Sequence, residues 1–159
     1  MFLSELTLKN FRSYRKHTFS FSPITIILGP NTAGKTNILE AIFLLSNGKS
    51  FRADHETDML LWNQEIARVN AELKIRDEQL NLEVVLTPGQ VGGQKAPHKR
   101  FLVNGVGKRQ IDFVGNLFTV LFWPEDLDLV TGSPSLRRRY LDFILCQVDR
   151  EYRRSLLSY

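Results

Sequence analysis

Eight consecutive residues have the types and spacing that bind a phosphate group. They read Gly29-Pro30-Asn31-Thr32-Ala33-Gly34-Lys35-Thr36, which fits the pattern G-x-x-x-x-G-K-[ST]. The two glycines would let the loop curl around a phosphate without a Cβ in the way. Lys35 would reach the β- and γ-phosphates, and the Thr36 hydroxyl would bind Mg²⁺. The pattern predicts a site for ATP and Mg²⁺ that includes the following residue, Asn37.

The residues around this loop predict the elements that must position it. Residues 24–28 form a short, mostly β-branched run between Pro23 and Gly29, which is typical of a buried strand. Apolar residues then recur at helical spacing, and we expect a helix over residues 35–46 that stops near Asn47-Gly48. The loop would therefore sit between a strand and a helix N-terminus, where free backbone N–H groups and the helix dipole favour an anion.

Composition limits the classes of protein that the chain can represent. The chain has 159 residues, 43% hydrophobic and 24% charged, which suits one ordinary soluble domain. No apolar run approaches the roughly 20 residues of a membrane span, and the N-terminus lacks a signal-peptide pattern. Cys146 is the single cysteine, which excludes an intrachain disulfide and a cysteine zinc site. The cytoplasm is the default compartment, and a net charge of +4 permits a nucleic-acid partner without establishing one.

The remaining elements follow from alternation and turn signals. Strands are expected over residues 3–11, around Phe19 and Phe21, and over residues 67–75 and 80–86, with a turn at residues 76–79. Asn104-Gly105 predicts a type I′ hairpin, and residues 87–98 read as an exposed loop. Residues 49–64 should form a loop with one helical turn. A second buried strand is expected over residues 118–123, and one long helix from Ser133 as N-cap to the end of the chain.

Phosphoryl transfer needs an acidic group on a strand to hold Mg²⁺ and position water. The best candidate is the run from Val120 to Asp126, but Pro124 breaks the strand before the acids. Glu125 and Asp126 could instead cap the next turn or face the nucleotide. The sequence thus contains a phosphate cradle without a clear partner that activates water.

Two basic clusters are candidate nucleic-acid contacts. The hairpin at residues 104–105 is bracketed by Arg100, Lys108 and Arg109, which could touch a DNA backbone or be merely solvated. The second cluster is Arg137-Arg138-Arg139, which would lie in the first turn of a helix. Its members could be solvated, with one ion pair to Asp142 or Glu125, or could contact a phosphate.

Several segments together resemble the N-terminus of the group of ATP-driven DNA proteins that includes SMC and RecF. The segments are Leu8-Lys9-Asn10-Phe11-Arg12-Ser13-Tyr14 and residues 29–42. Three more, Lys49-Ser50-Phe51-Arg52, Val103-Asn104-Gly105 and residues 122–142, are similar to the bacterial RecF family. Thr32 stands where these loops commonly have glycine, and the threonine restricts the backbone conformations available at this position.

The resemblance implies an α/β fold: a P-loop ATPase head of the ABC/SMC type, with antiparallel hairpins around the P-loop strand and helix. It implies ATP-dependent homodimerisation, DNA binding at gaps and single/double-strand junctions, and work with RecO and RecR in recombinase loading and the SOS response. Arg12 would approach the nucleotide, and Glu125 would lie near the γ-phosphate. RecF proteins continue well past this length, so the chain reads as a first lobe, residues 1–159, that binds ATP without turning it over.

Two other interpretations remain open. A self-contained small P-loop kinase or NTPase would fit the length, but it would need an acidic strand and a lid of its own. The other is a nucleotide-gated DNA clamp, in which ATP drives association and hydrolysis only resets the clamp. It differs from the preferred interpretation in the rate of hydrolysis and not in fold.

Overall fold

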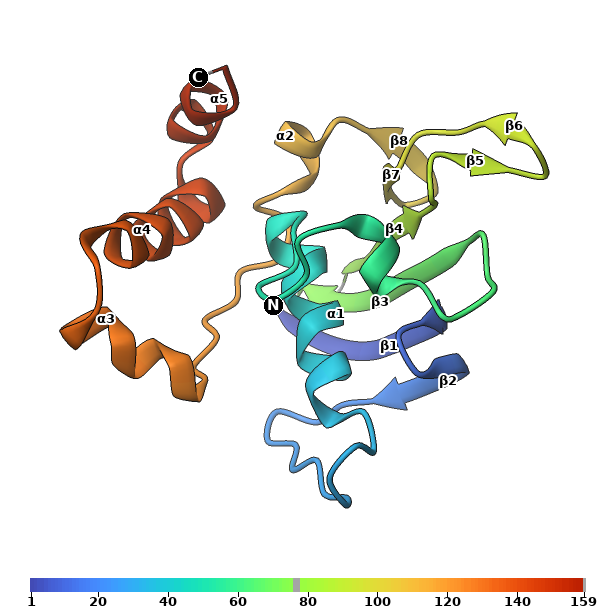
Figure 1. Cartoon of the computed structure of the whole chain (residues 1–159), viewed down its shortest axis with the longest axis horizontal. Helices are drawn as coiled ribbons and strands as arrows, with labels where there is room; N and C mark the ends of the chain where they lie inside the picture. Colours follow the sequence, from blue (N-terminus) through green and yellow to red (C-terminus); the bar gives the residue numbers. More distant parts are fainter. Residues whose placement is uncertain (76–77, 159) are drawn as a thin grey trace.

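The computed structural model describes residues 1–75 and 78–158, with helices gathered beside one antiparallel sheet (Figure 1). The sheet has six strands in the order β2-β1-β3-β4-β7-β8, and a separate two-stranded ribbon, β5-β6, extends from it. The strands are β1 Phe2–Phe11, β2 Tyr14–Ser20, β3 Ala67–Ile75, β4 Glu78–Leu86, β5 Gln90–Val91, β6 Gln94–Lys95, β7 Lys99–Val103 and β8 Val106–Lys108. The predicted loop at residues 87–98 therefore carries a short ribbon.

Alternation along the strands produces one apolar and one polar face. In β3, Ala67, Val69, Ala71 and Leu73 are fully buried, while the residues between them are mostly exposed. The strands predicted from this pattern are confirmed, and their antiparallel register brings the apolar residues of each strand onto one side. The predicted turn at residues 76–79 falls partly on Arg76 and Asp77, which lie outside the described residues.

Helix α1, Lys35–Asn47, packs on the apolar face of the sheet, and Phe113 of α2, Gln110–Phe113, joins the same core beside β7. Helix α1 buries Ile38, Ala41, Leu44 and Leu45 in the same core cluster as the sheet residues. Its end is confirmed, because Gly48 adopts a left-handed conformation (φ 69°) and its N–H donates to the carbonyl of Leu44. The core therefore sits between α1 and the sheet, and it holds α1 and the loop before it in place.

Two further predictions of local structure are confirmed. Asn104 and Gly105 both have positive φ angles, 49° and 75°, as a type I′ hairpin between β7 and β8 requires. The predicted helical turn in residues 49–64 is the 3₁₀-helix η1, Glu56–Met59.

Two of the predicted strands, at residues 24–28 and 118–123, are wrong. Residues 24–28 and 118–123 belong to no described strand. Ile26 is 78% exposed and Val120 is 86% exposed. A buried strand needs neighbours that accept its backbone hydrogen bonds and cover its side chains. Among the described residues, neither run has a strand beside it: only isolated contacts reach them, such as those of Gln147 with the backbone of Thr119 and of Trp123 with Phe51. The apolar sequence therefore does not become buried sheet.

The single long helix predicted after Ser133 is also wrong. After Ser133 the chain forms two helices instead of one, α4, Pro134–Val148, and α5, Arg150–Ser158. Two short helices, η2, Pro124–Leu127, and α3, Asp128–Thr131, precede them. Asp149 breaks the run because its backbone is extended and its Oδ1 accepts hydrogen bonds from the N–H groups of Glu151 and Tyr152. Pro134 does occupy the start of α4, but Ser133 makes no side-chain cap bond. No helix in the described ranges is long and apolar enough to span a membrane.

Candidate functional site

The loop at residues 29–36 leads directly into α1, and Gly34 meets two geometric demands there. Its φ is +90°, a conformation that side chains with a Cβ rarely adopt. A Cβ on Gly34 would also lie 2.8 Å from Tyr14 Oη and 3.0 Å from Ser13 Oγ. The turn between β1 and β2 therefore packs against the loop at a point that only glycine allows, as the motif predicts.

Hydrogen-bond donors gather where the loop meets the helix. Lys35 Nζ donates to the carbonyls of Gly29 and Pro30 at 2.7 and 2.8 Å, so its ammonium group lies within the curl of the loop. The backbone N–H groups of Gly34, Lys35 and Thr36 have no acceptor among the described residues, and the Thr36 side chain is exposed. An ammonium group, free N–H groups and the positive end of α1 all favour an anion, so these residues fit a polyphosphate.

Thr32 departs from relaxed backbone geometry. Its φ is 73°, in the left-handed region, which is an outlier for a β-branched residue. The sequence-based expectation of reduced freedom at this position therefore corresponds to local backbone strain of about 1–2 kcal/mol. Such strain persists only where the surrounding structure holds the residue in place.

Behind the loop, a buried carboxylate joins three segments of the chain. Glu40, on α1, is fully buried. Arg12 Nε and Nη2 donate to Glu40 Oε2 and Oε1 at 2.8 and 2.6 Å. Arg52 Nη2 donates to Oε2 at 2.7 Å, and Ser50 Oγ donates to Oε1 at 2.6 Å. These contacts tie the β1–β2 turn and residues 50–52 to the helix that follows the phosphate loop.

Two opposing effects act on the pKa of Glu40. Burial acts to raise it, and hydrogen bonds from Arg12, Arg52 and Ser50 act to lower it. The hydrogen bonds prevail, so the pKa of Glu40 lies below its ordinary value of 4.5. The carboxylate is therefore charged at neutral pH and holds both guanidinium groups in fixed orientations.

Sequence reasoning missed this cluster. The resemblance places Arg12 at the nucleotide, which stays a prediction. The structure shows its guanidinium on Glu40, four residues after Thr36 on the same face of α1. The available signal is Glu40 itself, a charge among the apolar residues of the helix, because a buried charge requires partners. Asn37 completes the connection, since its amide donates to Ser13 Oγ at 2.9 Å and its Oδ1 accepts from Arg52.

The acidic run near residue 125 does not form an acidic strand. Residues 124–127 are the 3₁₀-helix η2. Asp126 Oδ2 accepts a hydrogen bond from the N–H of Trp123 at 2.9 Å, which is the capping role that the sequence leaves open. The side chain of Glu125 lies outside the described part of the structure, so its predicted place near the γ-phosphate stays a prediction.

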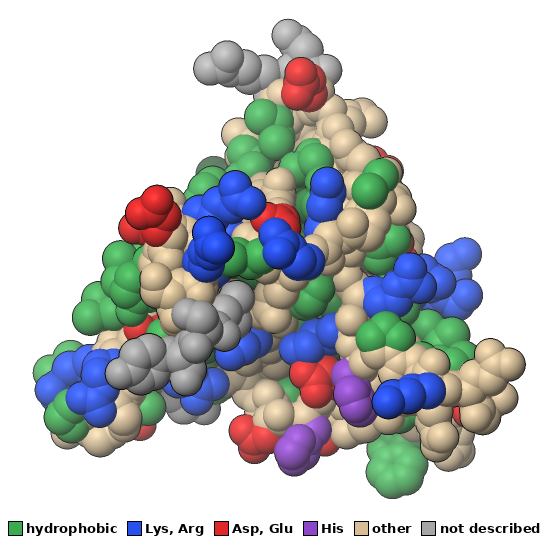
Figure 2. Space-filling view, turned by 90° about the horizontal axis from the view of Figure 1, so that it is seen from above, with side chains coloured by type: hydrophobic (Ala, Val, Ile, Leu, Met, Phe, Trp, Pro, Cys, Tyr) green, Lys and Arg blue, Asp and Glu red, His purple; other side chains and the backbone are tan. Residues whose placement is uncertain are grey.

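The basic residues proposed for DNA contact are not brought onto one surface. Arg100 faces the open side of the sheet, whereas Lys108 pairs with the buried Phe101 and so faces the other side. Arg109 pairs with Asp112 at 3.0 Å. Figure 2 shows lysines and arginines in the middle of one face with acidic side chains among them, so that face is not uniformly basic.

The three arginines on α4 have separate environments. Arg137 donates to the carbonyls of Leu129, Val130 and Gly132, at the end of α3. The guanidinium carbon of Arg139 lies 5.5 Å from the Phe143 ring centroid. Arg138 is exposed. Among the described side chains, Asp142 accepts a hydrogen bond from Tyr152 and forms no ion pair with these arginines, so the predicted pair with Asp142 is wrong. The alternative pair with Glu125 lies outside the described side chains.

Comparisons with known proteins agree with this geometry. A family model described as AAA ATPase domain matches residues 1–91. The DNA replication and repair protein RecF of Oenococcus oeni is 39% identical over 160 residues, and the RecF of Geobacillus kaustophilus is 38% identical over 161 residues. Both matches cover 100% of this chain and 41% of the relative. The chain thus spans about two fifths of the length of the relatives that it matches.

Solved structures show the same fold. The recombination mediator protein RecF with ATP in the RecFOR pathway aligns with a TM-score of 0.87 and 32% identity, covering 98% of this chain and 41% of that one. The SMC head domain from Thermotoga maritima aligns with a TM-score of 0.57 and 28% identity, over 70% of this chain and 40% of that one. The chain therefore belongs to the AAA ATPase domain family and has the P-loop ATPase fold of RecF and SMC heads, and RecF proteins match it over its whole length.

Proposed function

We propose that this chain is the ATP-binding lobe of a RecF-type DNA repair protein. The observation that carries the proposal is the loop at residues 29–36, with free N–H groups, the Lys35 ammonium and the N-terminus of α1 turned to one site. Lys35 binds the β- and γ-phosphates, and the backbone of residues 31–36 wraps the phosphates. Thr36 supplies a hydroxyl to Mg²⁺, which neutralises the charge that develops on the phosphates.

Arg12 and Asn37 act beside the loop in this proposal. Glu40 orients the Arg12 guanidinium, and Asn37 links α1 to Ser13 on the β1–β2 turn. A nucleotide on the loop would therefore meet a turn whose position is already determined by the hydrogen bonds of Arg12 and Asn37. Glu125 is retained as the candidate that faces the γ-phosphate.

Hydrolysis requires groups that we assign to the rest of the protein. Within the described residues, the acidic run at 124–127 is a 3₁₀-helix and supplies no acid at the end of a strand. We propose that residues 1–159 are the first lobe of an ABC-type head, whose acidic strand and signature motif lie in the remainder. ATP then joins two heads as a homodimer, which binds DNA at gaps and single/double-strand junctions with RecO and RecR as partners.

A row of cations on the open face of the sheet supports DNA contact. In the antiparallel register, Lys16 pairs with Lys9, and Lys9 pairs with Arg68. Arg68 pairs with Val85, which pairs with Arg100. Directly paired residues point to the same side of a sheet, and neighbouring strands lie about 4.8 Å apart. The four cations therefore span five strands, with Val85 between Arg68 and Arg100, and Arg68 also pairs with Glu83 at 2.6 Å. Such a row could track a phosphate backbone.

Salt dependence of DNA binding tests this surface. In the RecF-type protein that carries this chain, Lys9→Glu with Lys16→Glu should weaken DNA binding and lower the slope of log K against log salt by about 1 for each phosphate that is no longer neutralised. Lys74→Glu is the matched control, because Lys74 lies at the other end of β3 on the same face. An unchanged slope in the double variant would remove this row from the DNA interface.

Turnover distinguishes the proposal from the small-kinase interpretation. The 159-residue chain should bind ATP without steady multiple-turnover hydrolysis, because the groups that position water are assigned to the remainder of the protein. A turnover assay over many equivalents of ATP measures this directly. Sustained hydrolysis that disappears in Lys35→Ala would favour a self-contained NTPase.

A further inference from the structure

A cavity lies away from the loop at residues 29–36, between the end of α1 and helices α4 and α5. Its volume is about 460 Å³, which is within the usual range for small-molecule sites. Its wall is built from the loop at residues 49–56, from β7 and α2, Gln110–Phe113, and from α4 and α5. None of its lining residues belongs to residues 29–36, so it is not part of the proposed nucleotide site.

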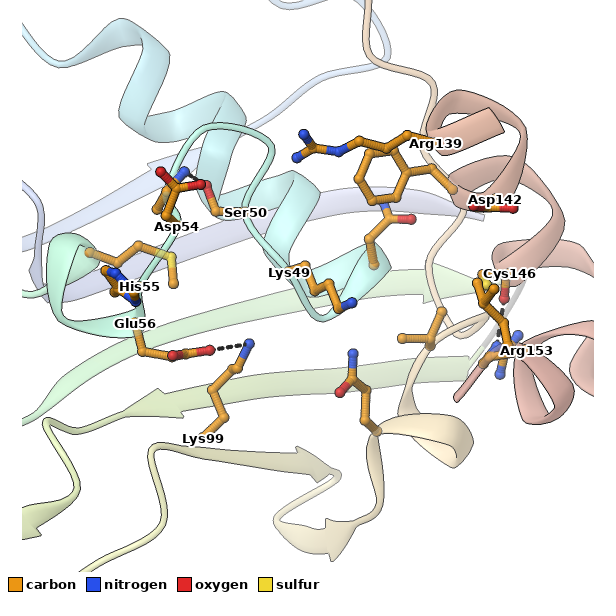
Figure 3. A pocket seen from close by; sticks show the side chains of 17 residues that line it. Lys49, Ser50, Asp54, His55, Glu56, Lys99, Arg139, Asp142, Cys146 and Arg153 are labelled. Carbon is orange, nitrogen blue, oxygen red and sulfur yellow. Dashed lines mark hydrogen bonds and ion pairs between the residues drawn. The ribbon is translucent and has the colours of Figure 1, made fainter. Parts of the chain in front are cut away.

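The cations on its wall fall into two groups (Figure 3). Lys99 is held by Glu56 at 2.7 Å, and Arg153 donates to the carbonyls of Ile111 and Cys146. Both side chains therefore already have partners within the protein. Lys49 and Arg139, by contrast, have no carboxylate partner among the described side chains.

The two unpaired cations come from opposite walls. Lys49 extends from the loop after α1, and Arg139 extends from α4 toward that loop. Asp54, a carboxylate on the same wall, lies beside Ser50 on the part of the loop away from Lys49. Asp142, on α4 near Arg139, also lines the cavity, and its Oδ1 accepts a hydrogen bond from Tyr152. Neither carboxylate forms an ion pair with Lys49 or Arg139 among the described side chains, so both cations remain available to an anion.

A buried acceptor in the same wall lacks a donor. Asn47 is 7% exposed and lines the cavity. Its Nδ2 donates to Ser46 Oγ at 2.7 Å, whereas its Oδ1 is buried with no hydrogen-bond partner in the described structure. Buried polar atoms are nearly always paired, so an orphaned acceptor on a cavity wall is available to a donor from a ligand or a water molecule.

From these observations we propose that the cavity binds a small phosphate ester that carries hydroxyl groups. A phosphate monoester has a charge close to −2 at neutral pH, which matches the two unpaired cations, whereas a carboxylate would neutralise only one. A hydroxyl of the same molecule donates to Asn47 Oδ1. The apolar parts of the wall, Met59 and Val114 among them, cover the carbon skeleton. The proposal does not depend on ATP binding at the other site.

Calorimetric titration with ribose 5-phosphate tests the proposal. The 159-residue chain carrying Lys35→Ala is used, so that the phosphate loop does not contribute. We expect saturable binding of ribose 5-phosphate, weaker binding of inorganic phosphate, and none of ribose. Absence of saturable binding for both phosphate compounds would overturn the proposal, and so would equal binding of ribose.

Substitutions assign the binding to this cavity. Lys49→Ala and Arg139→Ala should each weaken ribose 5-phosphate at least tenfold, and both side chains are exposed, so folding should be unaffected. Arg138→Ala and Lys95→Ala are matched controls outside the cavity and should change nothing. Asn47→Leu should reduce ribose 5-phosphate to the affinity of inorganic phosphate while leaving inorganic phosphate unchanged. Equal losses in the cavity and control variants would show non-specific charge attraction and overturn the assignment.

Discussion

The sheet with α1 and the segments at 24–28 and 118–123 have similar apolar sequences but different environments. Leu44 and Val69 are fully buried, whereas Ile26 and Val120 are 78% and 86% exposed. The difference is the presence of neighbouring strands, since α1 and six paired strands cover one another, whereas the two segments have no strand beside them among the described residues. An apolar run thus becomes buried structure only where a partner covers it, and the fold of this chain supplies that partner only in the first region.

The largest expected effect is removal of the buried charge that ties the first region to the phosphate loop. Glu40→Ala should cost about 3–5 kcal/mol, because Arg12 and Arg52 would lose the carboxylate that compensates them. Urea unfolding measures the loss. Glu83→Ala is the control, since Glu83 pairs with the half-exposed Arg68 and should cost about 1 kcal/mol or less. Similar losses in both variants would contradict a structural role for Glu40.

A matched pair of truncations compares the two regions directly. Leu44→Ala, in the core under α1, should lower the free energy of unfolding by about 2–5 kcal/mol. Ile26→Ala should change it by less than about 0.5 kcal/mol, because that side chain is already exposed. A large loss in Ile26→Ala would mean that residues 24–28 are covered in solution.

Acid should destabilise the chain partly through Glu40. Because the pKa of this carboxyl is lowered on folding, the unfolded state binds its proton first as pH falls. Its contribution is therefore complete above the ordinary value of 4.5 and is lost as pH falls through the lower folded value. Unfolding free energies of the wild type and Glu40→Gln, measured from pH 7 to pH 3, should show a shallower decline in the variant. Parallel curves would contradict the assignment.

The smallest effect concerns the strained position in the phosphate loop. Thr32→Gly should stabilise the chain by up to about 1 kcal/mol, because glycine adopts the φ of 73° without strain, although it adds entropy to the unfolded chain. Ala33→Gly, next to it without a positive φ, should be neutral or destabilising by up to about 1 kcal/mol. Thermal unfolding distinguishes the two, and equal effects would place the strain elsewhere.

The sequence predicts local structure well where a short segment determines it. The phosphate loop, the end of α1 at Gly48 and the Asn104-Gly105 hairpin depend on conformations that a few residues impose. The strand at residues 24–28 and the continuity of the C-terminal helix depend on neighbours and on one capping carboxylate, Asp149. A pattern of apolar residues carries no information about either.

The same distinction applies to the candidate site. Gly34 and Lys35 lie next to each other in the sequence, at the junction of the loop and α1, whereas the Glu40 cluster joins residues far apart in the sequence. The segment around Arg12 singles out that arginine, but its partner can only be suspected from a charge within an apolar helix. The Lys9–Lys16–Arg68 row likewise emerges from strand register, which the sequence of each strand does not reveal.

Calorimetric titration of the 159-residue chain with ATP and Mg²⁺ tests the nucleotide site most directly. The chain should bind one equivalent of ATP. Lys35→Ala should weaken binding at least tenfold, which is about 1.4 kcal/mol or more. The matched variant Lys95→Ala, on the exposed β6 strand, should bind as the wild type does. ATP binding that is unchanged in Lys35→Ala would contradict the assignment of residues 29–36 as the nucleotide site.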